Sequence, residues 1–280
     1  MKILKFLSVL VLSILAASCS KETASPASAD GTENLSLIKT ISSGNYSIEL
    51  FSTSPTLKVG YNKVYLRLKD LSGNAVNNVS FNWQPIMHMT TMQHSAPYSL
   101  VTKIANTDAL YGGYIVFSMA GNSMEYWELT INYSVNNVNY SVTDTLNVAA
   151  SASRNLESFT GTDGVSYLLA LVDPAMPAVA VNDMSALLFK MDDMMSYSSV
   201  SGYTIAIDPR MPSMGNHSSP NNVNLVQSSG DSFYRGKLSL TMTGYWKISL
   251  QVMNTSGSTI QGQPITETNE SSNIYFEVEF

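Results

Sequence analysis

Hydrophobic and polar residues alternate with a period of two along much of the chain. The clearest segments are 64–69, 126–133 and 246–252, where apolar side chains take every second position. Such alternation is typical of a β-strand that buries one face. Turn-forming residues separate the strands: Ser72-Gly73-Asn74, Asn77-Asn78, Asn136-Asn137, Ser229-Gly230-Asp231 and Ser256-Gly257. No stretch has a sustained helical period, so the pattern predicts an all-β chain built of two-sheet sandwiches.

Motifs of the first part of the chain recur in the second. Residues 85–97 (PIMHMTTMQHSAP) and 209–220 (PRMPSMGNHSSP) share two methionines, a histidine, a serine and a proline when counted back from their ends. Farther on, a group with identical internal spacing occurs twice, each time followed by a tryptophan: Tyr111, Gly113, Met119, Gly121 and Trp127, then Tyr234, Gly236, Met242, Gly244 and Trp246. The repeat predicts two tandem sandwich domains, at 41–150 and 151–280.

The N-terminus has the features of an export signal. Lys2 and Lys5 precede an apolar run at 6–15, which is too short to span a membrane, and small residues lead to Cys19. This arrangement resembles a bacterial lipobox and predicts a lipoprotein signal peptide at 1–18, a lipidated Cys19 and a flexible tether at 19–40. The alternative is an ordinary cleaved signal followed by a stray cysteine. Lipid would bind the protein to a membrane of the cell envelope, and Ser20 favours the outer membrane, facing the periplasm.

Composition argues against several classes of function. The signal holds two lysines and no acidic residue, which leaves 13 basic and 21 acidic side chains and a formal charge of −8 in the mature chain. We therefore expect no nucleic-acid partner. All three histidines lie in the two methionine-rich segments, and no hydrolase, phosphate-binding or paired-carboxylate motif is present. We expect no enzymatic activity.

The two methionine-rich segments are candidate metal sites. Thioether sulfur is a soft neutral donor that suits Cu(I), and imidazole also binds copper. In the first segment the predicted ligands are Met89, Met92 and His94, with Met87 and His88 as further candidates. Neighbours on an extended strand point to opposite faces, so Met87 and His88 would not both bind one ion. In the second segment the predicted ligands are Met211, Met214 and His217, and Gly215 would let His217 turn back toward the sulfur atoms.

Alternatives remain open for these and other methionines. Exposed Met and His side chains would also fill irregular surface near the edge of a sandwich. Met119 and Met242 are additional candidate ligands, but each shares a strand face with apolar residues, which favours core packing. A third group, Met184, Met191, Met194 and Met195, is interpreted as an apolar stretch before a turn and is left out of the site.

The order of these motifs resembles the YtkA-like and FixH-like domains of exported bacterial proteins. The shared features are a Met-x-x-Met-x-His type loop, a Tyr-x-Gly segment, a Met-x-Gly strand end and a Trp-led strand, over about 56–148 and 187–252. The resemblance implies immunoglobulin-like sandwiches and a role in copper handling. We expect a membrane-anchored protein that captures, buffers or transfers Cu(I), with a copper transporter, an oxidase or an efflux component as its partner. The alternative is a non-metal immunoglobulin-like interaction module of the cell envelope.

Overall fold

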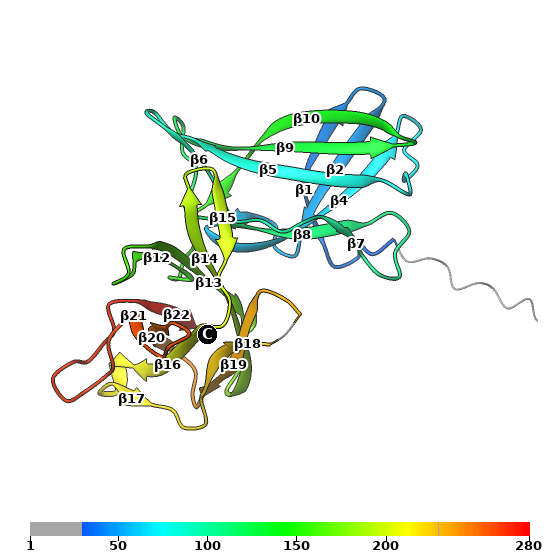
Figure 1. Ribbon diagram of the computed structural model, residues 1–280. Helices are drawn as coiled ribbons and strands as arrows, with labels where there is room; N and C mark the ends of the chain where they lie inside the picture. The colour runs from blue at the N-terminus through cyan, green and yellow to red at the C-terminus, as the bar shows by residue number, and fades with distance from the viewer. Residues whose placement is uncertain (1–29, 229) are drawn as a thin grey trace, which may run out of the picture.

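The computed structural model describes residues 30–228 and 230–280, and within them the chain is built almost entirely of β-strands (Figure 1). The one helical element of this part is the 3-10 turn η1 (Pro212–Met214). The all-β prediction is therefore confirmed. Among the same residues no helix is both long and apolar enough to cross a membrane. The predicted signal peptide, Cys19 and tether residues 19–29 lie outside the described residues.

Residues 30–149, called the first half below, form two facing sheets and a short strand pair. The five-stranded sheet has the order β1-β2-β4-β8-β7, with β1 (Ser36–Ser43), β2 (Tyr46–Ser52), β4 (Gly60–Asp70), β8 (Tyr111–Phe117) and β7 (Thr102–Lys103). The four-stranded sheet has the order β10-β9-β5-β6, with β10 (Val138–Leu146), β9 (Tyr126–Val135), β5 (Ser80–His88) and β6 (Gln93–Ser95). β3 (Leu57–Lys58) pairs in parallel with β11 (Val148–Ala149).

The core of the first half lies between these sheets, as the alternating pattern predicts. Val64, Leu66 and Leu68 of β4 are fully buried and face the inward side chains of β5 and β9, among them Trp83 and Trp127. The strand β1 begins at Ser36, inside the segment predicted as tether. Its apolar residue Ile41 is buried in this core, which gives the segment a reason to pair with β2.

Residues 150–280, the second half, form one continuous sheet of eleven strands rather than two separate sheets. Its main order is β12-β13-β14-β19-β18-β16-β20-β21, while β15, β17 and β22 pair with β14, β16 and β20. The strands are β12 (Leu156–Thr160), β13 (Ser166–Asp173), β14 (Ala180–Asp193), β15 (Ser196–Ser199), β16 (Thr204–Met211), β17 (His217–Ser218), β18 (Val223–Gln227), β19 (Phe233–Leu240), β20 (Tyr245–Met253), β21 (Thr259–Gln261) and β22 (Tyr275–Glu279).

This sheet curls around a core of its own. Phe159 of β12 and Val278 of β22 come from opposite parts of the strand order, yet both belong to one buried cluster with Trp246, Ile248 and Leu250 of β20. Curling explains why β18 connects what would otherwise be two facing sheets. The predicted inward face of β20 is confirmed, because its alternate residues are at most 1 % exposed.

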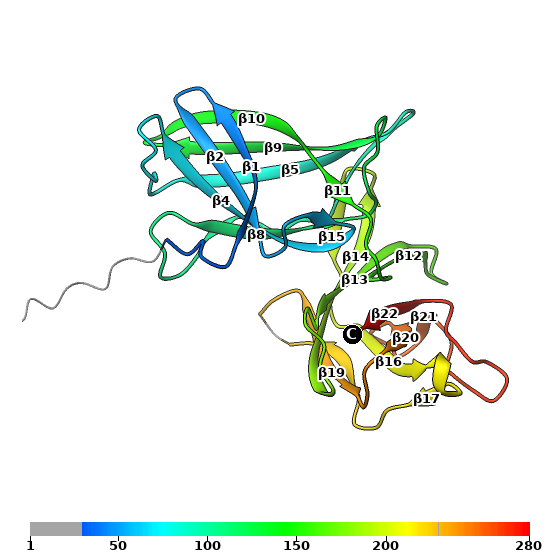
Figure 2. The same ribbon diagram turned by 180° about the vertical axis from the view of Figure 1, so that it is seen from behind.

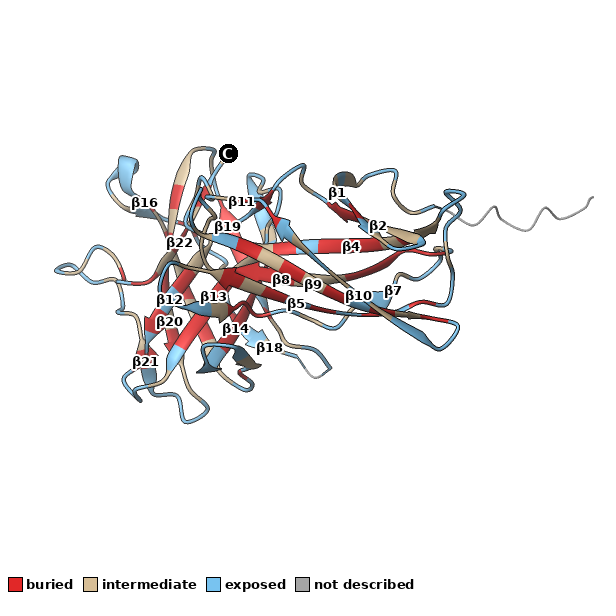
Figure 3. Ribbon diagram, turned by 90° about the horizontal axis from the view of Figure 1, so that it is seen from above, coloured by how far each residue is buried: buried red, intermediate tan, exposed pale blue. Residues whose placement is uncertain are grey.

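The two halves pack directly against each other through a third apolar cluster. Val116 of β8 lies with Leu168 and Ala170 of β13 and with Leu187 and Phe189 of β14. β14 is buried on both faces in this region, and the buried residues run in red along it and β13 (Figure 3). Residues 150–155 connect β11 to β12 at this junction outside any strand (Figure 2).

Both repeated tryptophans make the same contact. The indole Nε1–H of Trp127 donates to the carbonyl oxygen of Met119 at 2.9 Å, and that of Trp246 donates to the carbonyl oxygen of Met242 at 3.0 Å. Each indole is fully buried, and each bond holds the segment that connects the preceding strand to the strand of the tryptophan. The same contact is therefore present in each half, although Trp127 follows Met119 by eight residues and Trp246 follows Met242 by four.

Candidate functional site

The first methionine-rich segment forms the connection between β5 and β6. The backbone N–H of Met89 donates to the carbonyl oxygen of Met92 at 2.9 Å, which closes a tight turn after β5. The turn leaves the side chain of Met92 48 % exposed and brings His94 opposite Met87 in the strand pair. Met92 and His94 therefore lie at the edge of the four-stranded sheet, where β6 is the last strand.

His94 is held with one ring nitrogen available. Its Nδ1 lies 2.8 Å from the carbonyl oxygen of Ser95, an acceptor, so Nδ1 carries the proton in the neutral ring. The ring stands edge-on to the indole of Trp127, with centroids 5.4 Å apart and planes at 85°. A histidine whose Nδ1–H is bonded to a backbone carbonyl presents the lone pair of Nε2, which is the usual arrangement of a metal-binding histidine.

A pocket of about 280 Å³ opens beside Met92 and His94. Its other walls come from the second half and include Met191, Met194, Tyr167 and Tyr197. The pocket is thus lined by three methionines and one histidine from both sides of the junction. This is where the third methionine group, which the sequence pattern left out of the site, contributes two of its members.

The hairpin of β14 and β15 carries these two methionines to the first half (Figure 1). Met194 and Met195 form its two-residue turn, and the carbonyl oxygen of Met194 accepts a hydrogen bond from the backbone N–H of Ser95 at 2.9 Å. Met191 stands opposite Tyr197 in the strand pair. No local feature of the sequence points to this contact, because it joins segments about a hundred residues apart.

The remaining predicted ligands of the first segment lie elsewhere. Met87 is fully buried in the core, and Met89 packs partly buried against the same core. His88 is on the opposite face of β5 from Met87, as the alternation predicts. Its ring stacks on Tyr126 with centroids 4.9 Å apart, and its Nδ1 lies 2.9 Å from the side-chain nitrogen of Gln93. The structure does not bring these three side chains into the wall of the pocket.

The second segment is built differently, and its predicted ligands do not gather in a pocket. Met211 is 3 % exposed and belongs to the second core, whereas Met214 on η1 is 56 % exposed and His217 on β17 is exposed. Met211 and His217 are opposite residues of the β16–β17 pair, so Met211 matches Met87 in position. The alignment of residues 85–97 with 209–220 in the sequence pairs Met211 with Met89 instead.

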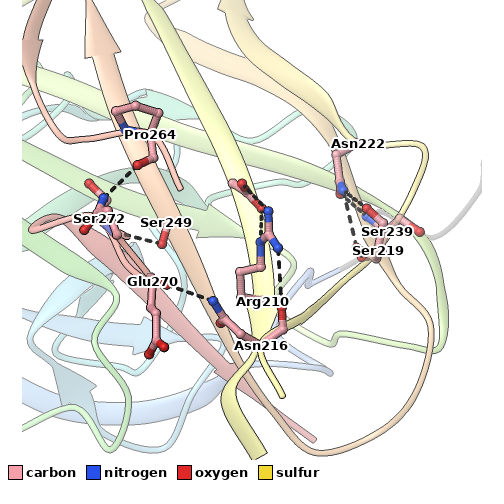
Figure 4. Close-up of polar contacts among 11 residues, drawn as sticks. Arg210, Asn216, Ser219, Asn222, Ser239, Ser249, Pro264, Glu270 and Ser272 are labelled. Carbon is pink, nitrogen blue, oxygen red and sulfur yellow. Dashed lines mark hydrogen bonds and ion pairs between the residues drawn. The ribbon is translucent and has the colours of Figure 1, made fainter. Parts of the chain in front are cut away.

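Polar contacts hold this second loop (Figure 4). Arg210 donates to the carbonyl oxygen of Asn216, and the side-chain amide of Asn216 donates to the carbonyl oxygen of Glu270 at 3.0 Å. Gly215 takes the left-handed conformation, with φ +64°, directly after η1. A hollow beside the loop is lined by Pro212, Gly215 and Asn216 together with charged residues, and neither Met214 nor His217 lines it.

Met119 and Met242 are partly buried against the first and second cores, which agrees with the core-packing interpretation. Their carbonyl oxygens are the acceptors for the two tryptophans.

The donor atoms of the pocket suit a soft monovalent metal ion. Three neutral thioethers and one neutral imidazole bind Cu(I) in preference to Mg²⁺ or Ca²⁺, which need oxygen ligands. Within residues 30–228 and 230–280 no three His, Cys, Asp or Glu side chains gather as a metal-binding group. Met92, Met191 and Met194 are 38–48 % exposed, so core packing does not occupy these side chains fully. The residues present therefore fit Cu(I).

Comparison with models of protein families found no match, and comparison with curated proteins found none. Among solved structures, the chain is similar to a DUF4785 family protein from Legionella pneumophila, with 10 % sequence identity and a TM-score of 0.27. The match covers 77 % of this chain and 55 % of that one, so the chain spans about half the length of the structure it matches.

Proposed function

We propose that this protein binds Cu(I) outside the cytoplasm and captures, buffers or hands on the ion. The observation that carries the proposal is that His94 and Met92 line one pocket at the edge of the four-stranded sheet. His94 is fixed by its Nδ1–H bond to Ser95, which leaves Nε2 as its metal-binding nitrogen, and the half-exposed Met92 lines the same pocket. Cu(I) accepts both donor types.

The open character of the site also supports exchange of the ion. Met92 keeps about half of its surface in contact with solvent, so a partner protein with its own thioether or thiolate ligands could approach the metal. Cysteine is missing from the described residues, and a thioether site avoids the loss of thiols to disulfides outside the cytoplasm. The partners we propose are a copper transporter, an oxidase or an efflux component.

A titration with Cu(I) tests the proposal. The chain from residue 21 to 280, which lacks the only thiol, is titrated anaerobically in competition with a chromogenic Cu(I) chelator. We expect one tightly held ion per chain, and a Met92→Leu, His94→Asn double variant should lose it. Zn(II) under the same conditions is the control for unspecific binding. Fewer than one held Cu(I) per chain would remove the copper function and leave a non-metal interaction module of the envelope.

The membrane anchor is a separate part of the proposal. It rests on the apolar run at 6–15 and the small residues before Cys19, which resemble a lipobox. A Cys19→Ala variant expressed with the full chain should no longer incorporate labelled fatty acid and should leave the membrane fraction. Retention of the label by that variant would exclude Cys19 as the lipidated residue.

A further inference from the structure

The methionines of the β14–β15 hairpin lie where a turn sequence does not require them. Residues 194–195 of the turn are Met-Met, and both side chains are more than 40 % exposed. Neither side chain belongs to the apolar core of the second half, so both are available for contacts outside it.

A backbone hydrogen bond holds one of these methionines, Met194, against the first half. The bond from Ser95 N–H to the carbonyl oxygen of Met194 ties the turn to β6, one residue from His94. Met194 and His94 then line the same pocket. A methionine of the second half and the histidine of the first half therefore share one pocket wall.

Met191 reaches the pocket by a different route. Leu187 and Phe189 on β14 pack in the apolar cluster between the halves, and strand alternation puts Met191 on the same face as these two residues. Met191 therefore continues the contact face of β14 into the pocket, next to Tyr197. The adjacent Met195 does not line the pocket.

We infer that the copper site is shared between the two halves, with Met92 and His94 of the first half and Met191 and Met194 of the second half as its four ligands. This inference rests on the proposed Cu(I) function and adds the complete ligand set. In this arrangement the bound ion would link the β14–β15 hairpin to β6. Movement of the hairpin away from β6 would remove two of the four ligands. Release to a partner is then coupled to movement of the hairpin.

Methionine-to-leucine variants test the shared site, because leucine keeps the apolar volume and removes the sulfur. Met191→Leu and Met194→Leu, singly and together, are compared with the matched control Met195→Leu, in the chain from residue 21 to 280. Binding is measured by chelator competition with Cu(I). We expect the double variant to lose at least tenfold in affinity, since even outer-shell changes at metal sites cost about that much. Met195→Leu should bind like the wild type.

A second measurement locates the ion directly. With methionine methyl groups labelled with carbon-13, Ag(I) is added as a soft, redox-stable probe, and the methyl resonances are followed by NMR. The signals of Met92, Met191 and Met194 should shift together at one equivalent, while those of Met195 and the 89 % exposed Met176 should stay in place. A thermal melt of each variant shows whether it folds like the wild type.

The outcomes separate the two proposals. If the double leucine variant folds and binds Cu(I) as tightly as the wild type while the Met92→Leu, His94→Asn variant does not bind, the site belongs to the first half alone and the shared site is wrong. If Ag(I) shifts Met92 but neither Met191 nor Met194, the conclusion is the same. If the wild type itself binds no Cu(I), the proposed function fails together with this inference.

Discussion

The backbone N–H of Ser95 donates to the carbonyl oxygen of Met194 at 2.9 Å, and this bond joins the edge strand of one half to a hairpin turn of the other. The amide would otherwise be an unpaired donor at a sheet edge, in a residue that is fully buried. The amide of Ser95 is hydrogen-bonded only when the β14–β15 hairpin packs against β6. The same contact brings the predicted ligand His94 next to methionines that the sequence places far away.

The two histidines His94 and His217 should differ in their effect on metal binding. His94→Asn should lower Cu(I) affinity at least tenfold, because His94 lines the pocket, while His217→Asn, at an exposed position outside it, should leave the affinity within about twofold. Competition with a Cu(I) chelator measures both. Equal losses for the two variants would show that the second loop binds metal as well as the first.

The repeated tryptophans should contribute similarly to stability. Trp127→Phe and Trp246→Phe each leave a cavity and an unpaired carbonyl oxygen, at Met119 and at Met242. We expect each to lower the free energy of unfolding by about 2 to 4 kcal/mol, measured by urea denaturation. Tyr126→Phe, at a 40 % exposed position, is the control and should change it by no more than about 0.5 kcal/mol. If either tryptophan variant lowered the free energy of unfolding by less than about 1 kcal/mol, the two tryptophans would not contribute similarly to stability.

Gly236 should not tolerate a side chain. A Cβ added there would lie 2.3 Å from the carbonyl oxygen of Val223, part of the backbone of β18. Gly236→Ala should therefore push β18 from β19 and cost about 3 kcal/mol in unfolding free energy. At Gly121 the nearest atom to an added Cβ is 3.4 Å away, so Gly121→Ala should stay within about 1 kcal/mol of the wild type. Chemical denaturation compares the two variants. A Gly236→Ala variant as stable as the wild type would disprove the close approach of Gly236 to the carbonyl oxygen of Val223.

Glu49 should make the stability depend on pH in the acid range. Burial raises the pKa of Glu49, but hydrogen bonds from Lys69 and Arg67 outweigh it, so the pKa lies below its ordinary value of 4.5. A carboxyl group with a lowered pKa stabilises the fold above the ordinary pKa, and this stabilisation is lost as the pH falls through the lowered value.

Unfolding at several pH values checks this expectation. Glu49→Gln should cost about 2 kcal/mol at pH 7 and progressively less below about pH 4.5, where the wild type loses the same contribution. Asp183→Asn is the control, because its side chain is 87 % exposed and its ion pair with Lys237 lies in water. A difference between wild type and Glu49→Gln that stays constant down to the acid limit would argue against the lowered pKa.

The strands themselves could be predicted from short stretches of sequence. The alternation at 64–68, 127–133 and 246–252 identifies buried faces correctly, because the period of two depends only on the local geometry of an extended backbone. The turn at Asn136 and Asn137 is equally local, since both residues have positive φ, which asparagine tolerates better than most side chains.

The site depended on contacts that no local pattern contains. The sequence placed Met92 and His94 in one loop, but whether their partners would be Met89 or the hairpin methionines depended on how the two halves pack. Met89 turned toward the core, and Met211 was buried because it takes the position of Met87 beside a core tryptophan. By itself the sequence determined an all-β chain with a repeated motif and soft donor atoms in two loops. Only the tertiary structure decided which of these residues line one pocket, because burial of Val116, Leu187 and Phe189 fixes the junction that brings residues 92–94 and 191–194 together.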